Sequence, residues 1–290
     1  MLQMHRNAQQ SSVVAFFRRL GYHYRPGDHM PVPLNPGKYR EPSIFQPRDF
    51  LGYMKKTGHL KDDEKAPEAV ILSYQKSLFD FVVKHHPVRF HTGYFKDHLA
   101  YLEETGGRVA IVGRFGIGAP AAAAMLEELI AWGVSSFVSI GTAGGLIKGL
   151  NPGAVVLCTG ALRDEGVSYH YLPGGGAALP DETLSDALRA AFDSAGVPYR
   201  PGITWTTDSL YRETQLELDS VIELGAITVE MESSALFAVA RYRETPIAAC
   251  FTISDSLAEL EWKPEFLSKD TNAGLEKLYM AAVDALRAQQ

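Results

Sequence analysis

The sequence has few cysteines and no long apolar run, and both absences narrow what the protein can be. Its only cysteines, Cys158 and Cys250, lie in apolar stretches typical of strands. We therefore expect buried free thiols in a reducing compartment, not a disulfide or a metal site. No apolar run approaches the roughly 18 residues that suggest a membrane span. These features predict a cytoplasmic protein that does not bind membranes.

Basic residues are also fewer than acidic residues. The formal net charge is -6 and the sequence pI is about 5.9. Such a balance does not attract nucleic acid, although it leaves room for a local basic pocket that binds a small anion. The histidines at 85, 86, 91 and 98 lack a recognised metal-ligand spacing. We expect neither a metal nor an organic cofactor.

The chain has 290 residues, of which 46% are hydrophobic and 21% charged, so it can bury a large core. Six prolines between residues 26 and 47 block regular hydrogen bonding there. A helix is predicted over 47–56, and a charged linker follows at 61–65. We place an N-terminal extension at 1–65 and a catalytic domain at 66–290.

Within this catalytic domain, short β-branched runs alternate with longer amphipathic runs, which predicts an α/β layered fold. The predicted strands cover 69–72, 108–112, 136–140, 154–158, 203–206 and 247–253. The predicted helices cover 119–132, 181–194, 231–242 and 275–287.

The most informative motif is Glu230-Met231-Glu232, which directly precedes a predicted helix. Cleavage of a nucleoside's sugar-base bond needs a sugar anchor, a leaving-group stabiliser and a positioned nucleophile. A carboxylate such as Glu232 can accept hydrogen bonds from both hydroxyls of a vicinal diol. The alternative is that both glutamates only cap the following helix and favour its N-terminal dipole.

Asp255 stands at the end of a predicted strand, in Ser254-Asp255-Ser256. Open α/β sheets bind ligands at such strand ends. A carboxylic acid there can protonate a departing purine at N7. The alternative is that Asp255 caps a loop.

Three further segments complete the pattern: the glycine-rich turn 113–120, the run 140–145 and the run 168–173. With the two acidic motifs, they resemble the nucleoside phosphorylase superfamily from about Ala66 to the C-terminus. The resemblance implies a three-layer domain, with a central mixed sheet flanked by helices. It implies cleavage of a ribonucleoside by phosphate, which gives the free base and ribose 1-phosphate. It also implies a homo-oligomer built from dimers.

The resemblance assigns residues to each part of the substrate, with Glu232 and Asp255 as the catalytic pair. The ribose is assigned to Met231, Glu232 and Thr142. The base is assigned to Tyr171, Ala143, Gly144, Glu230 and Arg212, and phosphate to Gly118, Thr142, Lys76 and Arg114. For the glycines alone, a tight strand-to-helix turn explains the sequence equally well. Loop packing likewise remains open for Tyr169 and His170.

The chain departs from the family at the phosphate site. Residues 72–78 replace the usual Gly-Asp-Pro-x-Arg loop, and Ser139 stands where a second arginine is expected. Losing both guanidinium groups removes the best bidentate phosphate ligands. A nucleosidase that uses water, and a noncatalytic nucleoside-binding module, therefore remain alternatives. Overall similarity favours uridine, whereas Asp255 favours purines.

Overall fold

The computed structural model describes residues 32–33, 35–61 and 64–288, which belong to two separate units. The unit Met1–Pro42 contains the short helix η1 (Pro36–Arg40), where the Asn35 side chain accepts a hydrogen bond from Gly37 N at 2.9 Å. Among the described residues, the unit Ser43–Gln290 contains all the other elements. The predicted boundary at residues 65 and 66 stays a prediction.

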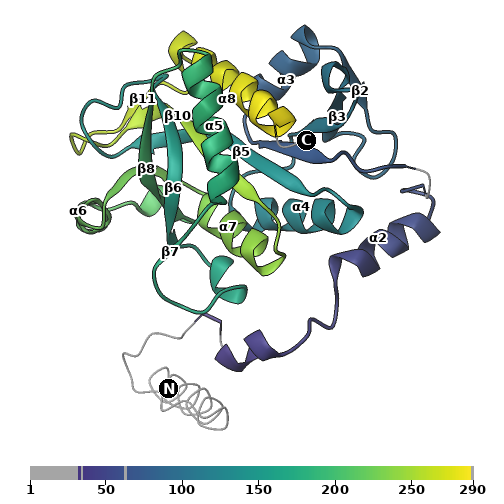
Figure 1. Ribbon diagram of the computed structural model, residues 1–290. Coiled ribbons are helices and arrows are strands. Elements are labelled where there is room, and N and C mark those ends of the chain that lie inside the picture. The colour runs from purple at the N-terminus through teal and green to yellow at the C-terminus, as the bar shows by residue number, and fades with distance from the viewer. Residues whose placement is uncertain (1–31, 34, 62–63, 289–290) are drawn as a thin grey trace, which may run out of the picture. The chain divides into compact units, whose positions relative to one another are not determined.

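Eleven strands of the described residues form one mixed sheet (Figure 1). They are β1 (Ala69–Ser73), β2 (Val88–Phe90), β3 (Leu99–Leu102), β4 (Val109–Val112), β5 (Ser136–Gly145), β6 (Val155–Asp164), β7 (Ala177–Ala178), β8 (Tyr199–Thr207), β9 (Ala226–Glu230), β10 (Ile247–Ser256) and β11 (Lys263–Pro264). The order is β11-β10-β6-β8-β9-β5-β1-β4-β3-β2, and β7 pairs with β6.

Part of this sheet closes on itself. Strand β10 pairs with β6 on one side and with β5 on the other, so β5, β9, β8, β6 and β10 form a closed circuit. Strands β1 and β10 run parallel to β5, and β4 runs parallel to β1. The C-terminal ends of these four strands therefore share one edge, which is where open parallel sheets bind ligands.

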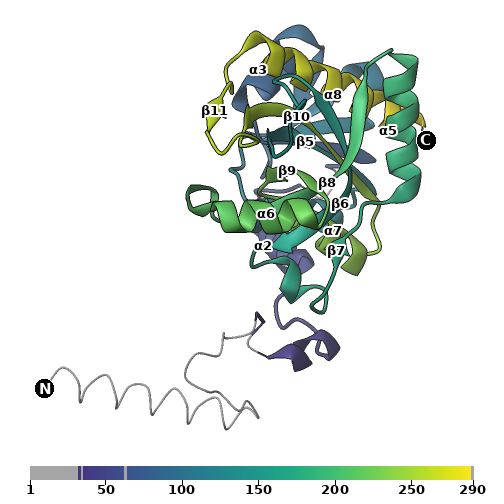
Figure 2. The same ribbon diagram turned by 90° about the vertical axis from the view of Figure 1, so that its left-hand side faces the viewer.

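Helices cover both faces of the sheet, which confirms the predicted α/β fold (Figures 1 and 2). The helices are α2 (Pro47–Lys56), α3 (Lys76–His85), α4 (Ala119–Trp132), α5 (Glu182–Ser194), α6 (Gln215–Glu223), α7 (Ser233–Tyr242) and α8 (Lys269–Ala288). Helices α4 and α7 share a core with Leu72, Phe137 and Phe251 of the sheet. Helices α3, α5 and α8 pack on the opposite face, against Ile71 and Ile140. Successive side chains of a strand point to opposite faces of the sheet, so each strand contributes to both of these cores.

The remaining helices lie at the margins of this sandwich. Helix α2, which confirms the helix predicted over 47–56, packs against α4 and buries Leu51. Its start is set by Pro47 and by the Asp49 side chain, which accepts a hydrogen bond from Gln46 N at 2.9 Å. Helix α6 packs beside β9, where Leu218 is buried (Figure 2).

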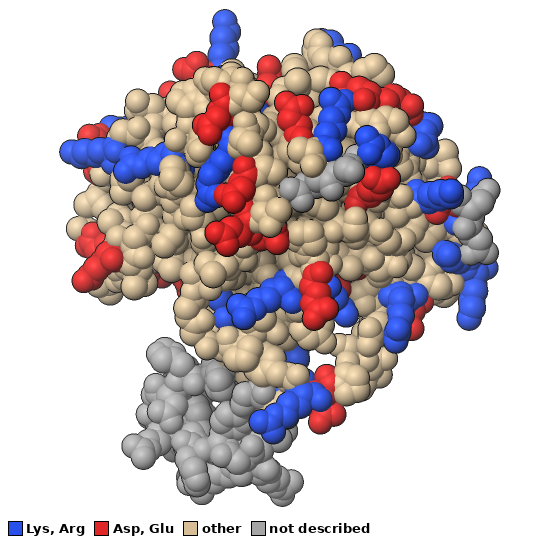
Figure 3. Space-filling model, in the orientation of Figure 1, with Lys and Arg blue, Asp and Glu red and all other residues tan. Residues whose placement is uncertain are grey.

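The described surface carries both signs of charge. On the face shown in Figure 3, Lys and Arg side chains are interspersed with Asp and Glu. Among the described helices, none has the length and apolar character needed to cross a membrane.

Candidate active site

Glu232 lies at the point where β9 gives way to α7, and it reaches across to the glycine-rich turn. Its side chain is 7% exposed, and its Oε1 accepts a hydrogen bond from Gly118 N at 2.5 Å. Gly118 caps the N-terminus of α4 with φ of 92°, a conformation that glycine adopts at little cost. The structure thus brings together the predicted sugar anchor and the predicted phosphate-binding turn, 114 residues apart in sequence.

Glu230 has a different position, because the protein itself occupies its carboxylate. Oε1 accepts from Thr206 Oγ1 at 2.5 Å, and Oε2 accepts from Glu232 N at 2.9 Å and Ser233 N at 2.8 Å. Glu230 therefore caps the start of α7, as one of the two sequence interpretations predicted for this residue. These bonds also fix the backbone on which Glu232 stands, and the assignment of Glu230 to the base stays a prediction.

The environment of Glu232 disfavours its charge. Burial, followed by the negative charge of Glu230, raises the pKa of Glu232 to about 8, although the bond from Gly118 N opposes this shift. Hydrogen-bond donors stabilise the ionised form of a buried carboxyl group. Glu232 is therefore suited to a ligand that brings hydroxyl groups.

Asp255 lies at the other end of the same region, near the end of β10. It is 8% exposed and pairs with Gly144 of β5 just after a register shift. Its Oδ1 accepts from Ser254 Oγ at 2.7 Å, and its Oδ2 accepts from Trp262 Nε1 at 3.1 Å. Two donors therefore orient the carboxylate, which is more than a loop cap requires.

The end of β5 connects the two acids. A Cβ on Gly144 would lie 3.3 Å from Asp255 Oδ2, so the absence of a side chain lets the carboxylate approach the strand. Thr142 lies two residues earlier, about 7 Å along a strand. Ala143 is buried between them. Met231, which is partly buried, lies between the two glutamates of the motif.

Sequence reasoning missed two residues that follow β1. Gln75 Nε2 donates to Thr142 Oγ1 at 2.9 Å, and the hydroxyl groups of Tyr74 and Ser139 are hydrogen bonded at 3.0 Å. Burial, with the charges of Glu232 and Glu230, raises the pKa of Tyr74 well above its ordinary value. Nothing local in the sequence signals these contacts, because each partner is more than sixty residues away.

Glu213 was also missed, and it stands near Asp255. Burial, followed by the charge of Asp255, raises the pKa of Glu213 to about 7. The neighbouring Arg212, predicted to bind the base, is exposed, and the pKa of Glu217 is lowered by hydrogen bonds from Thr214 and then by the charge of Arg212. The structure thus presents a partly buried carboxyl group, Glu213, directly after the exposed Arg212.

The two basic residues that the sequence assigns to phosphate, Lys76 and Arg114, are both paired with the carboxylate of Asp80. Lys76 Nζ bonds Asp80 Oδ2 at 2.6 Å, and Arg114 NH2 bonds Asp80 Oδ1. All three side chains are at least one-third exposed. The structure therefore holds Lys76 and Arg114 on Asp80 of α3, and phosphate would have to compete with that carboxylate. Their assignment to phosphate stays a prediction.

Tyr171 packs away from the sugar anchor. Its ring contacts Tyr242 edge-on with centroids 5.6 Å apart, and burial, followed by the charge of Glu127, raises its pKa. Tyr242 ends α7, nine residues after its start, which corresponds to about 14 Å of helix. The structure does not bring Tyr171 to Glu232, and its contact with the base stays a prediction.

The segment before Tyr171 is fixed by a buried network. Arg163 donates to Ser168 Oγ at 2.9 Å and to the carbonyls of Leu172 and Pro173. Tyr169 donates its hydroxyl proton to Arg163 O at 2.7 Å. These contacts support loop packing as the role of Tyr169.

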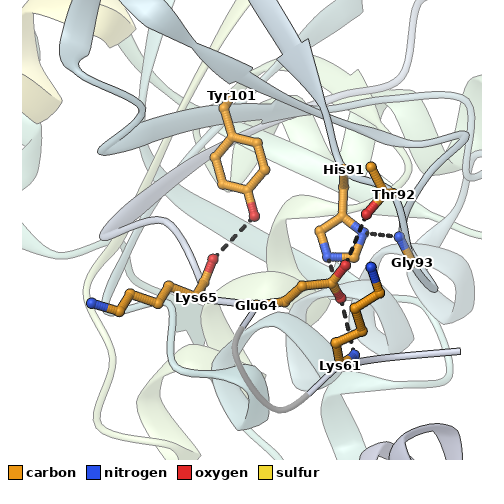
Figure 4. Close-up of polar contacts among 7 residues, drawn as sticks. All are labelled: Lys61, Glu64, Lys65, His91, Thr92, Gly93 and Tyr101. Carbon is orange, nitrogen blue, oxygen red and sulfur yellow. Dashed lines mark hydrogen bonds and ion pairs between the residues drawn. The ribbon is translucent and has the colours of Figure 1, made fainter. Parts of the chain in front are cut away.

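His91 belongs to a second polar cluster (Figure 4). It is 3% exposed, with Nε2 lying 3.3 Å from Glu64 Oε2 and Nδ1 accepting from Gly93 N at 2.9 Å. Thr92 Oγ1 donates to Glu64 Oε1 at 3.0 Å. His91 is thus a core histidine. The described residues contain no group of three or more potential metal-ligating side chains.

A family model described as the Phosphorylase superfamily matches residues 67–287, which include both Glu232 and Asp255. The chain belongs to this superfamily. Among relatives in the Phosphorylase superfamily, the uridine phosphorylase of Treponema pallidum (strain Nichols) is 29% identical over 195 residues, or 63% of this chain and 76% of that protein. The guanosine phosphorylase of Halorubrum lacusprofundi is 33% identical over 143 residues, covering 49% of this chain and 59% of that protein. The chain thus spans less than two-thirds of the second relative.

Two solved structures share the fold of this Phosphorylase superfamily chain. An AMP nucleosidase from Bacteroides thetaiotaomicron superposes with a TM-score of 0.67 and 22% identity, covering 84% of this chain and 97% of that one. A uridine phosphorylase from Vibrio fischeri gives a TM-score of 0.65 and 23% identity, covering 80% and 100%. Likeness at this identity concerns the fold alone.

Proposed function

We propose that the chain is a nucleoside phosphorylase. It cleaves the N-glycosidic bond of a ribonucleoside and transfers the ribosyl group to phosphate. In this step a phosphate oxygen bonds to C1′, and the C1′–N bond breaks with its electron pair going to the base. The named relatives, a uridine and a guanosine phosphorylase, support this reaction class.

The observation that carries the proposal is the placement of two buried carboxylates at the ends of β9 and β10, the two strands that pair with Gly144 at the end of β5. Glu232 is joined to the turn at Gly118, and Asp255 lies against Gly144. Glu232 anchors the ribose hydroxyls, with Met231 and Thr142 beside the sugar. Asp255 serves the departing base, for which Ala143 and Gly144 form the floor. A ribonucleoside presents its hydroxyl groups and its leaving group in this arrangement.

The test uses the full chain with inosine, adenosine, guanosine and uridine, each with and without phosphate. Chromatography would identify the free base and distinguish ribose 1-phosphate from ribose. We expect phosphate-dependent base release, and a purine preference if Asp255 acts as assigned. Release from none of these nucleosides would refute the proposal and favour a binding module.

A nucleosidase is the second candidate, and a specific observation favours it. Ser139 stands where the family places one arginine, and its hydroxyl group is hydrogen bonded to Tyr74 of the segment 72–78, which replaces the family loop that carries the other arginine. Neither group carries a positive charge that would attract phosphate. Ribose as the product, at an equal rate without phosphate, would identify hydrolysis.

We also propose a cytoplasmic homo-oligomer built from dimers, without cofactor. Buried free thiols at Cys158 and Cys250 are compatible with a reducing compartment. Light scattering of the full chain measures the assembly, and a monomeric, active protein would contradict it.

A further inference from the structure

The residues after β1, Tyr74 and Gln75, place uncharged side chains against β5. The Tyr74 ring packs edge-on against Phe115, with centroids 5.5 Å apart. A Cβ on Gly141 would lie 3.1 Å from Tyr74 Cδ2, so glycine permits this close approach to β5. With the bond to Ser139, these contacts hold the segment firmly against the neighbouring strand.

Gln75 follows Tyr74 directly, and only one of the two polar atoms of its side-chain amide is hydrogen bonded within the described part of the chain. Nε2 donates to Thr142 Oγ1, whereas Oε1 is buried and has no hydrogen-bond partner among the described residues. Oε1 lies beside β5, since a Cβ on Gly141 would be 3.6 Å from it. A buried acceptor left unpaired costs about 1–3 kcal/mol. Such an acceptor is therefore expected to receive a donor from a ligand.

The surrounding charges restrict what that ligand can be. Glu232 and Glu230 are the charged groups that act on neighbouring Tyr74, and both are acidic. Lys76 and Arg114 are held by Asp80. An amide oxygen near carboxyl groups favours a molecule that donates a proton and disfavours a bare anion.

We infer that Gln75 binds the attacking molecule, with its Oε1 accepting a hydrogen bond from an O–H of the nucleophile beside Thr142. The inference rests on the proposed cleavage of a nucleoside, and it names the feature that the nucleophile must have. Water and hydrogen phosphate both carry such an O–H. Gln75 orients the nucleophile without taking its proton. With water, the proton passes to solvent when the new C1′–O bond forms. With hydrogen phosphate, an unprotonated oxygen forms that bond and the O–H held by Gln75 keeps its proton.

The inference is tested with Gln75→Met, which retains length and loses the amide. Misplacing a nucleophile can lower the rate about 100-fold, so we expect kcat to fall by about that factor while KM for the nucleoside stays unchanged. The melting temperature should change little, because the lost hydrogen bond to Thr142 is offset by removal of an unpaired buried acceptor. Ser77→Ala, an exposed change in the next turn, is the matched control and should retain full activity.

Gln75→Glu separates the two sources of the O–H. A carboxylate still accepts from water but repels phosphate, so the ratio of ribose to ribose 1-phosphate should rise in the presence of phosphate. Wild-type kcat in Gln75→Met, or a loss of kcat accompanied by a lower melting temperature in both Gln75 variants, would overturn the inference. A wild-type chain that releases no base would instead overturn the proposed function.

Discussion

At the scale of single residues, the two glutamates of one motif have divided roles. Glu230 accepts hydrogen bonds from Thr206 and from the start of α7, so its oxygens are occupied by the protein. Glu232 is held by Gly118 N and retains a raised pKa. The sequence interpretations of capping and sugar binding are therefore compatible, because each can apply to a different carboxylate.

Activity and stability should depend on pH in opposite directions through Glu232. Its pKa is raised from 4.5 to about 8 in the folded chain. The ionised form accepts from the ribose hydroxyls, so kcat/KM should rise with pH toward 8. The unfolded chain loses this proton near 4.5 and the folded chain near 8, so the associated stability is full below 4.5 and is lost as pH rises through 8.

Rate profiles and thermal melts of wild type and Glu232→Gln between pH 5 and 9 check this expectation. The variant should be nearly inactive and folded, with a smaller decline of melting temperature over this range. A variant with wild-type activity would remove Glu232 from the sugar site.

Asp255→Asn should impair purine nucleosides far more than uridine. Only the purine departs with a protonated N7, and loss of a general acid lowers the rate by about 10²- to 10⁴-fold. Steady-state rates on inosine and uridine measure the difference. Asp186→Asn, an exposed change on α5, is the control. Equal losses on both nucleosides would mean that Asp255 has a structural role.

At the scale of elements, the hydrophobic periodicity of the sequence predicted the layers of the fold more accurately than it predicted where the strands end. The helix over 119–132 agrees with α4, and six predicted strands correspond to β1, β4, β5, β6, β8 and β10. Strand β10 continues to Ser256 through a register shift, because pairing with β5 and β11 outweighs its polar sequence. Polar residues there suggested a loop, so the pairing of Asp255 was not foreseeable.

Other elements were missed for identifiable reasons. Helix α3 buries Leu78, Phe79 and Val82 at helical spacing, but its first residues, 76–78, were compared with a family loop. Strand β9 is short and nearly all buried, so it has no alternating pattern. The circuit from β5 to β10 depends on long-range pairing, and no local signal of it exists in the sequence.

The packing of α8 on β10 depends on a small residue. A Cβ on Gly274 would approach Thr252 Oγ1 to 1.9 Å and Thr252 Cβ to 2.7 Å. Gly274→Ala should therefore destabilise the fold by about 1–3 kcal/mol despite alanine's higher helix propensity. Denaturant unfolding measures the change, with exposed Lys277→Ala as the control. An unchanged midpoint would show that α8 shifts freely.

At the scale of the whole molecule, residues before the matched family region contribute to the compact unit. Helix α2 buries Leu51 against the core that contains α4, and a fully buried leucine contributes about 1.5–3 kcal/mol. Glu64 adds the buried contact with His91 and the bond from Thr92 (Figure 4). The predicted extension 1–65 thus includes segments that contribute differently to the stability of the compact unit.

Two truncations separate these segments. Removing residues 1–42 should leave the melting temperature of the compact unit nearly unchanged, since that unit begins at Ser43. Removing 1–65 should lower it, because α4 loses α2 and His91 loses Glu64. If the extension also helps to close sites between subunits, both truncations should reduce activity or assembly, since association and stability are coupled. Melting curves, light scattering and nucleoside turnover distinguish these effects. A 1–65 truncation with wild-type stability, mass and rate would show that neither α2 nor Glu64 supports the catalytic domain.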